Sequence, residues 1–324
     1  MGAVDLPIEW PVAPMLAKAA KTVPEQPGDG PPVWLYEPKW DGFRAIVFRD
    51  GDEVRLGSRG GKDLARYFPE LVEAIRRELP ERVVVDAVVV SNTHLSNDYN
   101  VLVLAAPAVA SQVQPGQFVM VKPGVGDDPL LRRPFSVFEV LRDDARVTGL
   151  SLLNKRVGVT TRMLFALTPG DRVRCLGPLG RPFSVTEPPE RAWMVAGGVG
   201  LAPFATLAAA LRERNVKTTL FYGGRSATDL FHLDEFRQRG VSLTLATDDG
   251  SRGVQGNVTV PLARAFCDVD RATPIRVYAC GPTAMMRAVT ELAATHGRAI
   301  EVSLEQVMGC GLGGCYSCVI PVQR

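Results

Sequence analysis

The chain has 324 residues, enough for two or three domains, and with 46% apolar and 22% charged residues it can bury a core. Its formal net charge of +2 is too small to indicate a nucleic-acid or membrane partner. No apolar run reaches membrane-spanning length, and the N-terminus lacks the pattern of a signal peptide, so we expect a cytoplasmic protein. The 6 cysteines, three of them near the C-terminus, suit a metal or cluster site better than a disulfide framework.

Residues 1–86 have a pattern of predicted strands and helices that differs from that of the rest of the chain. Residues 34–61 read as strands joined by an Asp-Gly turn at Asp50 and Gly51. Residues 63–79 have the apolar spacing of a helix, and VVVDAVVV (83–90) reads as a buried strand. We therefore expect a small α+β unit here.

A lysine in this first part carries possible chemistry. In YEPKWDGFRA (36–45), Lys39 precedes an Asp-Gly pair and Arg44 follows it. Such a lysine is either a covalent nucleophile that attacks an α-phosphate, with Arg44 holding the ribose or a phosphate, or a surface lysine before a turn. The residues alone leave both readings open.

After residue 90 the pattern changes twice. Short strands separated by turns continue to about residue 190, which predicts a small antiparallel barrel. From residue 192, strands alternate with helices, which predicts a parallel sheet with crossover connections.

Three short motifs in these parts are candidates for cofactor binding. RRPFSV (132–137) could pair Arg133 with a flavin phosphate, or be an edge strand with a proline. GGVGLAP (197–203) could bring its backbone close to a pyrophosphate at a helix N-terminus, or be a tight strand-to-helix turn. YACGP (278–282) could place Cys280 in the crevice of a parallel sheet, or bury it as a small core residue.

The last candidate is a cysteine cluster. Cys310, Cys315 and Cys318 have the spacing C-x4-C-x2-C, which plant-type [2Fe–2S] sites use for three of their four ligands. We expect the fourth ligand to be missing from this chain, because no further cysteine follows and the earlier ones lie in other elements.

Taken in order, the motifs from RRPFSV to MGCGLGGCYSC resemble the ferredoxin-reductase-like flavoproteins, and most closely the electron-transfer subunits of NAD-linked dihydroorotate dehydrogenase. The resemblance runs from about residue 87 to residue 324. It implies FAD on the barrel, NAD(H) on the Rossmann-like domain, and a [2Fe–2S] cluster held by Cys310, Cys315 and Cys318. It also implies a partner, an FMN-bearing dihydroorotate dehydrogenase catalytic subunit of pyrimidine biosynthesis. The residues that it assigns to cofactor binding are Arg133, Pro134, Phe135, Ser136, Leu153, Asn154, Lys155, Thr160, Thr161, Gly197, Gly198, Gly200, Pro203, Cys280, Gly281 and Pro282.

Two of these positions depart from the family, and the coenzyme stays open. Family members usually have an aromatic residue in place of Asn154 and a glycine in place of Thr160. We see no acidic residue that follows the second Rossmann strand closely enough to bind a ribose hydroxyl, and Arg225 could accept a 2′-phosphate. Only the resemblance favours NAD over NADP.

The first 86 residues resemble something else, the opening of the adenylation domain of ATP-dependent DNA ligases. PMLAKAA (14–20), EPKWDGFR, GSRGGKDLARYFPEL (57–71) and VVVDAVV (83–89) carry the resemblance, which implies that Lys39 becomes adenylated. The glutamate that follows VVVD in ligases is replaced here, and the later ligase motifs are absent. We therefore expect a chimeric chain with its seam in VVVDAVVV and no DNA ligation.

The sequence thus predicts a multidomain chain. A truncated α+β nucleotidyltransferase fragment (1–86) precedes an antiparallel β-barrel FAD domain (87–190), an α/β Rossmann-like NAD domain (191–299) and a truncated [2Fe–2S] segment (300–324). Our first hypothesis is an oxidoreductase that passes electrons from NADH through FAD and a [2Fe–2S] cluster to its partner, and we expect the missing cluster ligand to impair this onward transfer. The alternatives are an ATP-dependent nucleotidyltransferase using Lys39, and a composite in which neither half completes a site.

Overall fold

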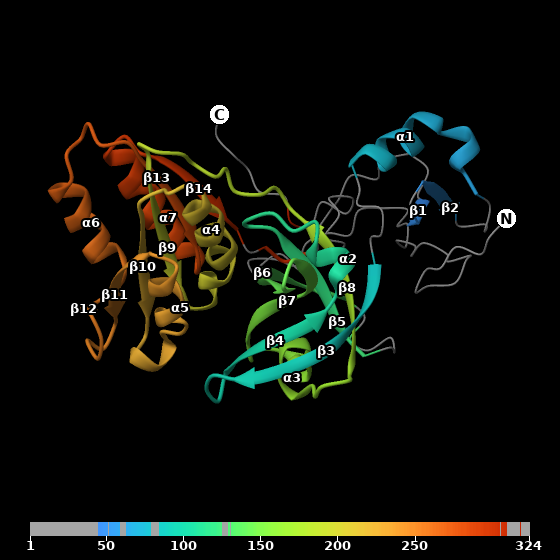
Figure 1. Ribbon diagram of the computed structural model, residues 1–324, viewed down its shortest axis with the longest axis horizontal. Coiled ribbons are helices and arrows are strands. Elements are labelled where there is room, and N and C mark those ends of the chain that lie inside the picture. Colours follow the sequence, from blue (N-terminus) through green and yellow to red (C-terminus); the bar gives the residue numbers. More distant parts are fainter. Residues whose placement is uncertain are drawn as a thin grey trace, which may run out of the picture. The chain divides into compact units, whose positions relative to one another are not determined.

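The computed structural model describes residues 45–50, 52–58, 63–78, 84–124, 129, 131–304, 306–309 and 318 (Figure 1). The chain separates into two compact units, residues 1–83 and residues 84–324. Lys39, Cys310 and Cys315 lie outside the described residues, so the predictions made for them stay predictions.

In the first unit, a hairpin packs against a short helix. Strands β1 (Ala45–Asp50) and β2 (Glu53–Ser58) are antiparallel, and Asp50 opposite Glu53 is the last pair before the predicted turn. Val54 and Leu56 of β2 form a small core with Val72 and Ile75 of the helix. The elements in the described residues of this unit are β1, β2, the 3-10 turn η1 (Ala65–Tyr67) and the helix α1 (Pro69–Glu78).

The helix begins later than the sequence pattern predicts. We expected it over residues 63–79, but residues 65–67 form a 3-10 turn and α1 starts at Pro69. Proline disfavours helical geometry in the residue before it, and Phe68 has the non-helical angles φ −136° and ψ 60°. Pro69 suits the first helical position because the N–H that it lacks would have no intrahelical partner there.

The second unit begins with a closed antiparallel barrel, which confirms the predicted barrel. Its strands follow the order β3-β4-β7-β6-β5-β8 around the barrel. Its elements are β3 (Val84–His94), β4 (Tyr99–Ala105), α2 (Pro107–Ala110), β5 (Phe118–Pro123), β6 (Arg133–Asp143), β7 (Arg146–Lys155), α3 (Val159–Ala166) and β8 (Arg172–Leu179).

The first barrel strand is half-buried, which corrects our expectation of a buried strand at residues 83–90. Ala87 and Val89 lie in the barrel core, whereas Val88 and Val90 are 40% and 54% exposed. A strand in a barrel has one inward and one outward face, so alternate residues reach solvent even in a run of valines. The strand starts at Val84, and Val84, Val85 and Asp86 pair with β8.

After the barrel comes a six-stranded parallel sheet with the order β12-β11-β10-β9-β13-β14 (Figure 1). The alternation of strands and helices in the sequence predicts this sheet correctly. Its elements are β9 (Arg191–Gly197), η2 (Gly198–Leu201), α4 (Ala202–Glu213), β10 (Thr218–Gly224), η3 (Ala227–Asp229), α5 (Leu233–Gln238), β11 (Ser242–Thr247), β12 (Val254–Gln255), α6 (Thr259–Asp268), β13 (Ile275–Cys280), α7 (Thr283–Thr295) and β14 (Ala299–Ser303).

Helices bury both faces of this sheet. Met194 of β9 shares one core with Phe204 of α4 and Phe236 of α5, while Val195 shares another with α6 and α7. Strands with two buried faces are apolar throughout, which explains the unbroken apolar run in β9.

The barrel and the sheet domain share a core. Phe138 and Leu153 of the barrel belong to the cluster that holds α4 and α5. The rings of Phe138 and His232 also contact each other at a tilt of 54°, with 4.7 Å between their centroids, and Glu139 forms an ion pair with Arg239. No helix in the described part of the chain is long and apolar enough to cross a membrane.

Candidate functional site

A cavity of about 1040 Å³ lies where the barrel meets the sheet domain. Strand β6, the end of β7 and the first turn of α3 form most of its wall. The sheet domain contributes Val199 and Ala202, and residues 306–308 follow β14. The lining residues are Pro129, Leu131, Arg133, Pro134, Phe135, Ser136, Leu153, Lys155, Val157, Gly158, Val159, Thr160, Thr161, Val199, Ala202, Gln306, Val307 and Met308.

The cavity brings together most of the residues that the resemblance assigns to FAD. The four residues Arg133, Pro134, Phe135 and Ser136 follow one another on β6, opposite Val121 to Phe118 of β5. The N–H of Val137 donates to the carbonyl of Gln117, directly before β5, and the alternation of an antiparallel ladder then turns the nitrogen of Pro134 away from β5, so the proline removes no bond of this ladder. Arg133 is exposed, and the only hydrogen bond of its side chain among the described residues is a long one from Nη1 to the carbonyl of Arg132 (3.4 Å), so most of its guanidinium donors are available to an anion.

The end of the cavity at α3 is suited to phosphate. The N–H groups of a helix's first turn have no intrahelical acceptor, and the helix dipole makes this end positive. Gly158 precedes α3 in an extended conformation, and Oγ1 of Thr161 accepts hydrogen bonds from the N–H groups of Val157 (2.9 Å) and Gly158 (2.8 Å). The first turn contains no acidic residue. An anion at this end of the cavity would meet no negative charge on the helix.

Lys155 adds a second cation to the cavity. It is the last residue of β7, and its ammonium lies 5.2 Å from the ring centroid of Tyr99. This cation–π contact orients the side chain without neutralising its charge. With Arg133, the cavity thus carries two cationic side chains and an apolar wall that includes Phe135, Leu153 and Val199.

Asn154 is placed differently from our expectation, because it does not line the cavity. Leu153 and Lys155 face the cavity, and successive residues of a strand point to opposite sides, so Asn154 points away. Its side chain is 1% exposed and donates hydrogen bonds to Oδ1 of Asn100 (2.7 Å) and the carbonyl of Thr161 (3.0 Å). The alternation of the strand gives the reason for this correction.

The glycine motif of the sheet domain packs against the YACGP motif. A Cβ on Gly200 would lie 2.2 Å from the carbonyl oxygen of Cys280, and one on Gly197 would lie 2.9 Å from Cδ of Pro282. Glycine is therefore required for the contact between these two turns. Of this region only Val199 and Ala202 line the cavity. Gly197, Gly198, Gly200, Pro203, Cys280, Gly281 and Pro282 are not among its lining residues.

These two turns nevertheless lie at the place where open parallel sheets bind ligands. They follow β9 and β13, which are neighbours, and β10 pairs with the other side of β9. The chain places β10, β11 and β12 on one side of β9, and β13 and β14 on the other, so the order of the strands reverses at β9. The crevice at the carboxyl ends of the strands at such a point is the usual ligand site. Cys280 is 1% exposed there, and Gly281 adopts φ +152°.

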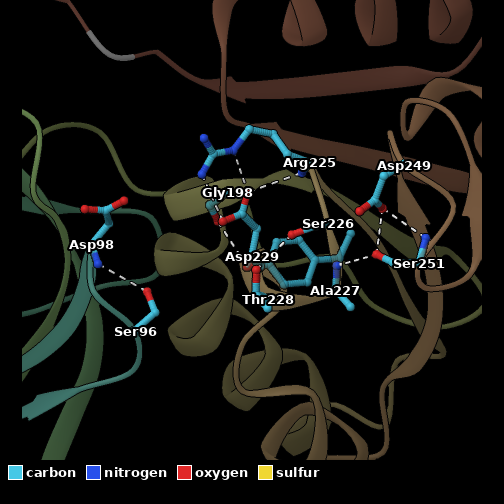
Figure 2. A network of polar contacts seen from close by, with 11 residues as sticks. Ser96, Asp98, Gly198, Arg225, Ser226, Ala227, Thr228, Asp229, Asp249 and Ser251 are labelled. Atoms are coloured by element: carbon cyan, nitrogen blue, oxygen red, sulfur yellow. Dashed lines mark hydrogen bonds and ion pairs between the residues drawn. The ribbon is translucent and has the colours of Figure 1, made fainter.

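The sequence interpretation found no acidic residue close enough to the second strand to bind a ribose hydroxyl, and the first acidic residue after that strand is Asp229. Asp229 lies in η3 and folds back, so that Nε and Nη2 of Arg225 donate to its carboxylate at 2.7 and 3.2 Å (Figure 2). The pKa of Asp229 is lowered mainly by this bond to Arg225, and that of Arg225 is raised by it. Asp229 lies five residues beyond the end of β10, and because of this distance the sequence interpretation did not consider it.

The ion pair belongs to a wider polar network at the ends of β10 and β11 (Figure 2). The hydroxyl of Tyr222 donates to the carbonyls of Gly198 (3.3 Å) and Asp229 (3.1 Å). The N–H of Ala227 donates to Oγ of Ser251 (2.8 Å), whose hydroxyl donates to Asp249 (2.6 Å). The network thus links the loop after β10 to the loop after β11.

No group of three or more metal-ligating side chains occurs in the part of the chain that the structure describes. Of the three cysteines predicted to bind iron, only Cys318 is described, and it is partly buried. The iron–sulfur segment therefore remains a prediction from spacing.

Several lining residues were missed by the sequence interpretation. Val157, Gly158 and Val159 precede or open α3, and Gln306, Val307 and Met308 follow β14. The position of Gly158, directly before a helix and two residues before Thr160, could have indicated this part of the cavity wall. The sequence contains no such signal for residues 306–308, because they reach the cavity only through the fold of the sheet domain.

Two family models match the chain. The model "Oxidoreductase NAD-binding domain" matches residues 194–291, and "ATP dependent DNA ligase domain" matches residues 14–158. The second range covers less than half of the chain and runs into the barrel, where strands β3 to β7 close with β8.

Among solved structures, the chain resembles the NADH-dependent reduced ferredoxin-NADP oxidoreductase with 30% identity and a TM-score of 0.63, over 72% of this chain and 80% of that one. A ferredoxin NADP+ reductase from Neisseria gonorrhoeae with bound FAD and NADP has the same fold, with 15% identity and a TM-score of 0.57 over 69% of this chain and 100% of that one.

The curated relatives are more similar. The dihydroorotate dehydrogenase B (NAD(+)) electron transfer subunit of Desulforamulus reducens is 38% identical over 219 residues, 68% of this chain and 81% of the relative. That of Bacillus caldolyticus is 38% identical over 223 residues, 68% of this chain and 82% of the relative. The chain therefore belongs to the family of dihydroorotate dehydrogenase B electron transfer subunits.

Proposed function

We propose that this chain is an electron-transfer flavoprotein that takes electrons from NADH and passes them to an FMN-bearing dihydroorotate dehydrogenase catalytic subunit in pyrimidine biosynthesis. The observation that carries the proposal is the cavity between barrel and sheet domain, because it unites the cations, the helix N-terminus and the apolar wall that a flavin nucleotide needs. The family membership supports the same conclusion.

The residues present fit FAD. The volume of about 1040 Å³ is at the upper end of the usual range for cofactor sites, which suits a large dinucleotide. Arg133, Thr160, Thr161 and the N-terminus of α3 would hold its phosphates, while Phe135 and Leu153 would pack on its apolar parts. When bound, FAD supplies the ability to accept a hydride and release electrons one at a time. The chain itself supplies binding and orientation and keeps water from the wall formed by Phe135, Leu153 and Val199.

The coenzyme would approach from the sheet domain. Val199 and Ala202 join the crevice at β9 and β13 to the cavity, so a dinucleotide lying along the carboxyl ends of these strands would have one end at the flavin site. Arg225 would bind a 2′-phosphate only by leaving Asp229. This supports NADH rather than NADPH as the electron donor.

Onward transfer would use the cysteine segment. Cys310, Cys315 and Cys318 are proposed as ligands of a [2Fe–2S] cluster on the basis of their spacing.

The test of this function is reconstitution with a partner. The purified chain is mixed with the catalytic subunit of a dihydroorotate dehydrogenase B relative, orotate and NADH without oxygen, and the dihydroorotate formed is measured. We expect dihydroorotate to form only when both proteins are present. Dihydroorotate formation by the catalytic subunit and NADH without the chain, or none with both proteins, would contradict the proposal.

The second candidate is nucleotidyl transfer by Lys39, which the ligase-domain match over residues 14–158 favours. Incubation with labelled ATP tests for a phosphoramidate between Lys39 and AMP, with Lys39→Ala as the blank. We expect no sealing of nicked DNA, because the later ligase motifs are absent and charge stabilisation at phosphorus contributes most of such catalysis.

A further inference from the structure

Three asparagines form a hydrogen-bonded row inside the barrel. Asn92, Asn100 and Asn154 lie on β3, β4 and β7, which are neighbours in the barrel, and Asn100 is directly opposite Asn154. Nδ2 of Asn154 donates to Oδ1 of Asn100 (2.7 Å), and Nδ2 of Asn100 donates to Oδ1 of Asn92 (2.6 Å). Asn100 and Asn154 are 0% and 1% exposed. Polar side chains this deeply buried in a barrel wall call for a reason.

The direction of the row is fixed at both ends by carbonyl groups, which can only accept. Nδ2 of Asn92 donates to the carbonyls of Leu164 (3.2 Å), Phe165 (3.0 Å) and Leu167 (2.8 Å). Nδ2 of Asn154 donates to the carbonyl of Thr161 (3.0 Å). Asn92 and Asn100 must therefore point their oxygens toward the next amide's nitrogen, and no amide of the row can turn over without losing a bond.

Both ends of the row terminate on α3. Thr161 belongs to the first turn of this helix, while Leu164, Phe165 and Leu167 carry carbonyls at its C-terminal end. The row thus ties α3 to three barrel strands at two places, the carbonyl of Thr161 and the carbonyls that begin at Leu164, one turn further along. The same first turn, with Thr160 and Thr161, lines the cavity.

The row does not satisfy every polar atom that it buries. Oδ1 of Asn154 is buried and has no hydrogen-bond partner among the described residues. An unpaired buried acceptor costs free energy. An apolar residue at this position would avoid that cost, so the row favours a role in placing α3 over one in general stability.

We propose that Asn92, Asn100 and Asn154 are positioning residues for the phosphate end of the flavin site. They set the position of α3 so that its first-turn N–H groups point into the cavity, and because amides are neutral they do not weaken the positive end of the helix. A carboxylate in the row would lose a hydrogen bond, because it cannot donate, and its negative charge would weaken the positive end of the helix. The inference rests on the proposed function, in which the cavity binds FAD.

The experiment compares two ligands that differ in their phosphates. The flavin-free full chain and its variants are titrated with FAD and with riboflavin, which lacks phosphate, and affinity is read from flavin fluorescence. In Asn100→Asp we expect FAD affinity to fall about tenfold while riboflavin affinity changes less than about twofold. Asn97→Asp is the matched control, because this substitution makes the same chemical change at an exposed residue of the same hairpin. It should leave both affinities unchanged.

Other outcomes separate the failures. An equal loss for FAD and riboflavin, or no loss for either, would overturn the positioning role. A wild-type chain that binds FAD no more tightly than riboflavin would overturn it too, because α3 then holds no phosphate. If the wild-type chain binds neither, the proposed function itself fails. Should Asn100→Asp not fold by circular dichroism, the half-buried Asn92→Ala variant decides by the same comparison.

Discussion

The carboxylate of Asp229 receives two hydrogen bonds from Arg225, from Nε at 2.7 Å and from Nη2 at 3.2 Å. Asp229 is nearly buried, with 9% of its side chain exposed, whereas Arg225 is 68% exposed. The carboxylate of Asp229 thus holds the guanidinium of Arg225 in place after the end of β10. Without this pair, the guanidinium would be available to a 2′-phosphate.

Removing the charge of Asp229 should change coenzyme preference. In Asp229→Asn the guanidinium of Arg225 loses its anionic partner and becomes available to the 2′-phosphate of NADPH. Charge-assisted bonds to phosphate are among the strong ones, so we expect the ratio of kcat/KM for NADPH to that for NADH to rise about tenfold. Reduction of an artificial electron acceptor under steady-state conditions measures both values.

The matched control for this variant is Asp234→Asn. Asp234 pairs with Arg237 at 2.6 Å on α5, but its side chain is 85% exposed. Breaking this surface pair should not alter the coenzyme ratio. Equal ratios in the Asp229 variant and the wild type would show that Arg225 does not govern the choice.

The pH dependence of this preference follows from the pKa of Asp229. The Arg225 guanidinium lowers that pKa below the ordinary carboxyl value, so the pair is intact above the ordinary value and is lost only as pH falls through the lowered one. Because the 2′-phosphate of NADPH itself titrates near pH 6, the range to compare lies above that value, and the coenzyme ratio of the wild type should stay constant between about pH 7 and pH 8. A rise in NADPH use within that range would indicate that another group controls the site.

Arg133→Ala should weaken FAD retention. A charged contact to phosphate contributes about 1.5–3 kcal/mol, which corresponds to a loss in affinity of roughly 10- to 150-fold. Arg142→Ala is the control, since Arg142 is an exposed arginine on the same strand but outside the cavity. Equilibrium dialysis of FAD measures the effect, and equal retention in both variants would remove Arg133 from the site.

The second unit should fold without the first. A fragment of residues 84–324 retains every barrel strand, and we expect it to bind FAD as the full chain does. A fragment that starts at Ala87 lacks the pairs of Val84, Val85 and Asp86 with β8, so it should have the lower Tm. Thermal unfolding of both fragments is the measurement. An insoluble 84–324 fragment would mean that the two units need each other.

Cys175 should resist alkylation. Burial in the barrel raises the pKa of its thiol to about 12, and its side chain has no exposed surface, so neither thiolate nor reagent is available at pH 8. Cys267 on α6 is exposed and serves as the internal control. Iodoacetamide followed by peptide mass spectrometry should find Cys267 labelled and Cys175 unlabelled until urea is added. Equal labelling of Cys175 and Cys267 in the folded protein would contradict the burial of Cys175 in the barrel.

Much of the second unit can be predicted from its sequence, and the exceptions have physical reasons. The spacing of turns and strands gives the barrel, and the alternation from residue 192 gives the parallel sheet. Asn154 was misplaced because its neighbours Leu153 and Lys155 line the cavity, and strand alternation turns the residue between them inward. Asp229 was overlooked because a 3-10 turn, which has no sequence signature here, folds it back to the strand end.

The central claim is that the cavity holds a flavin that NADH reduces. An absorption spectrum of the purified, FAD-supplemented chain, recorded without oxygen before and after one equivalent of NADH, tests it most directly. The account predicts a yellow protein whose flavin band is bleached by NADH in the wild type and retained less in Arg133→Ala. A chain that takes up no FAD, or whose bound flavin band is unchanged by NADH, would contradict it.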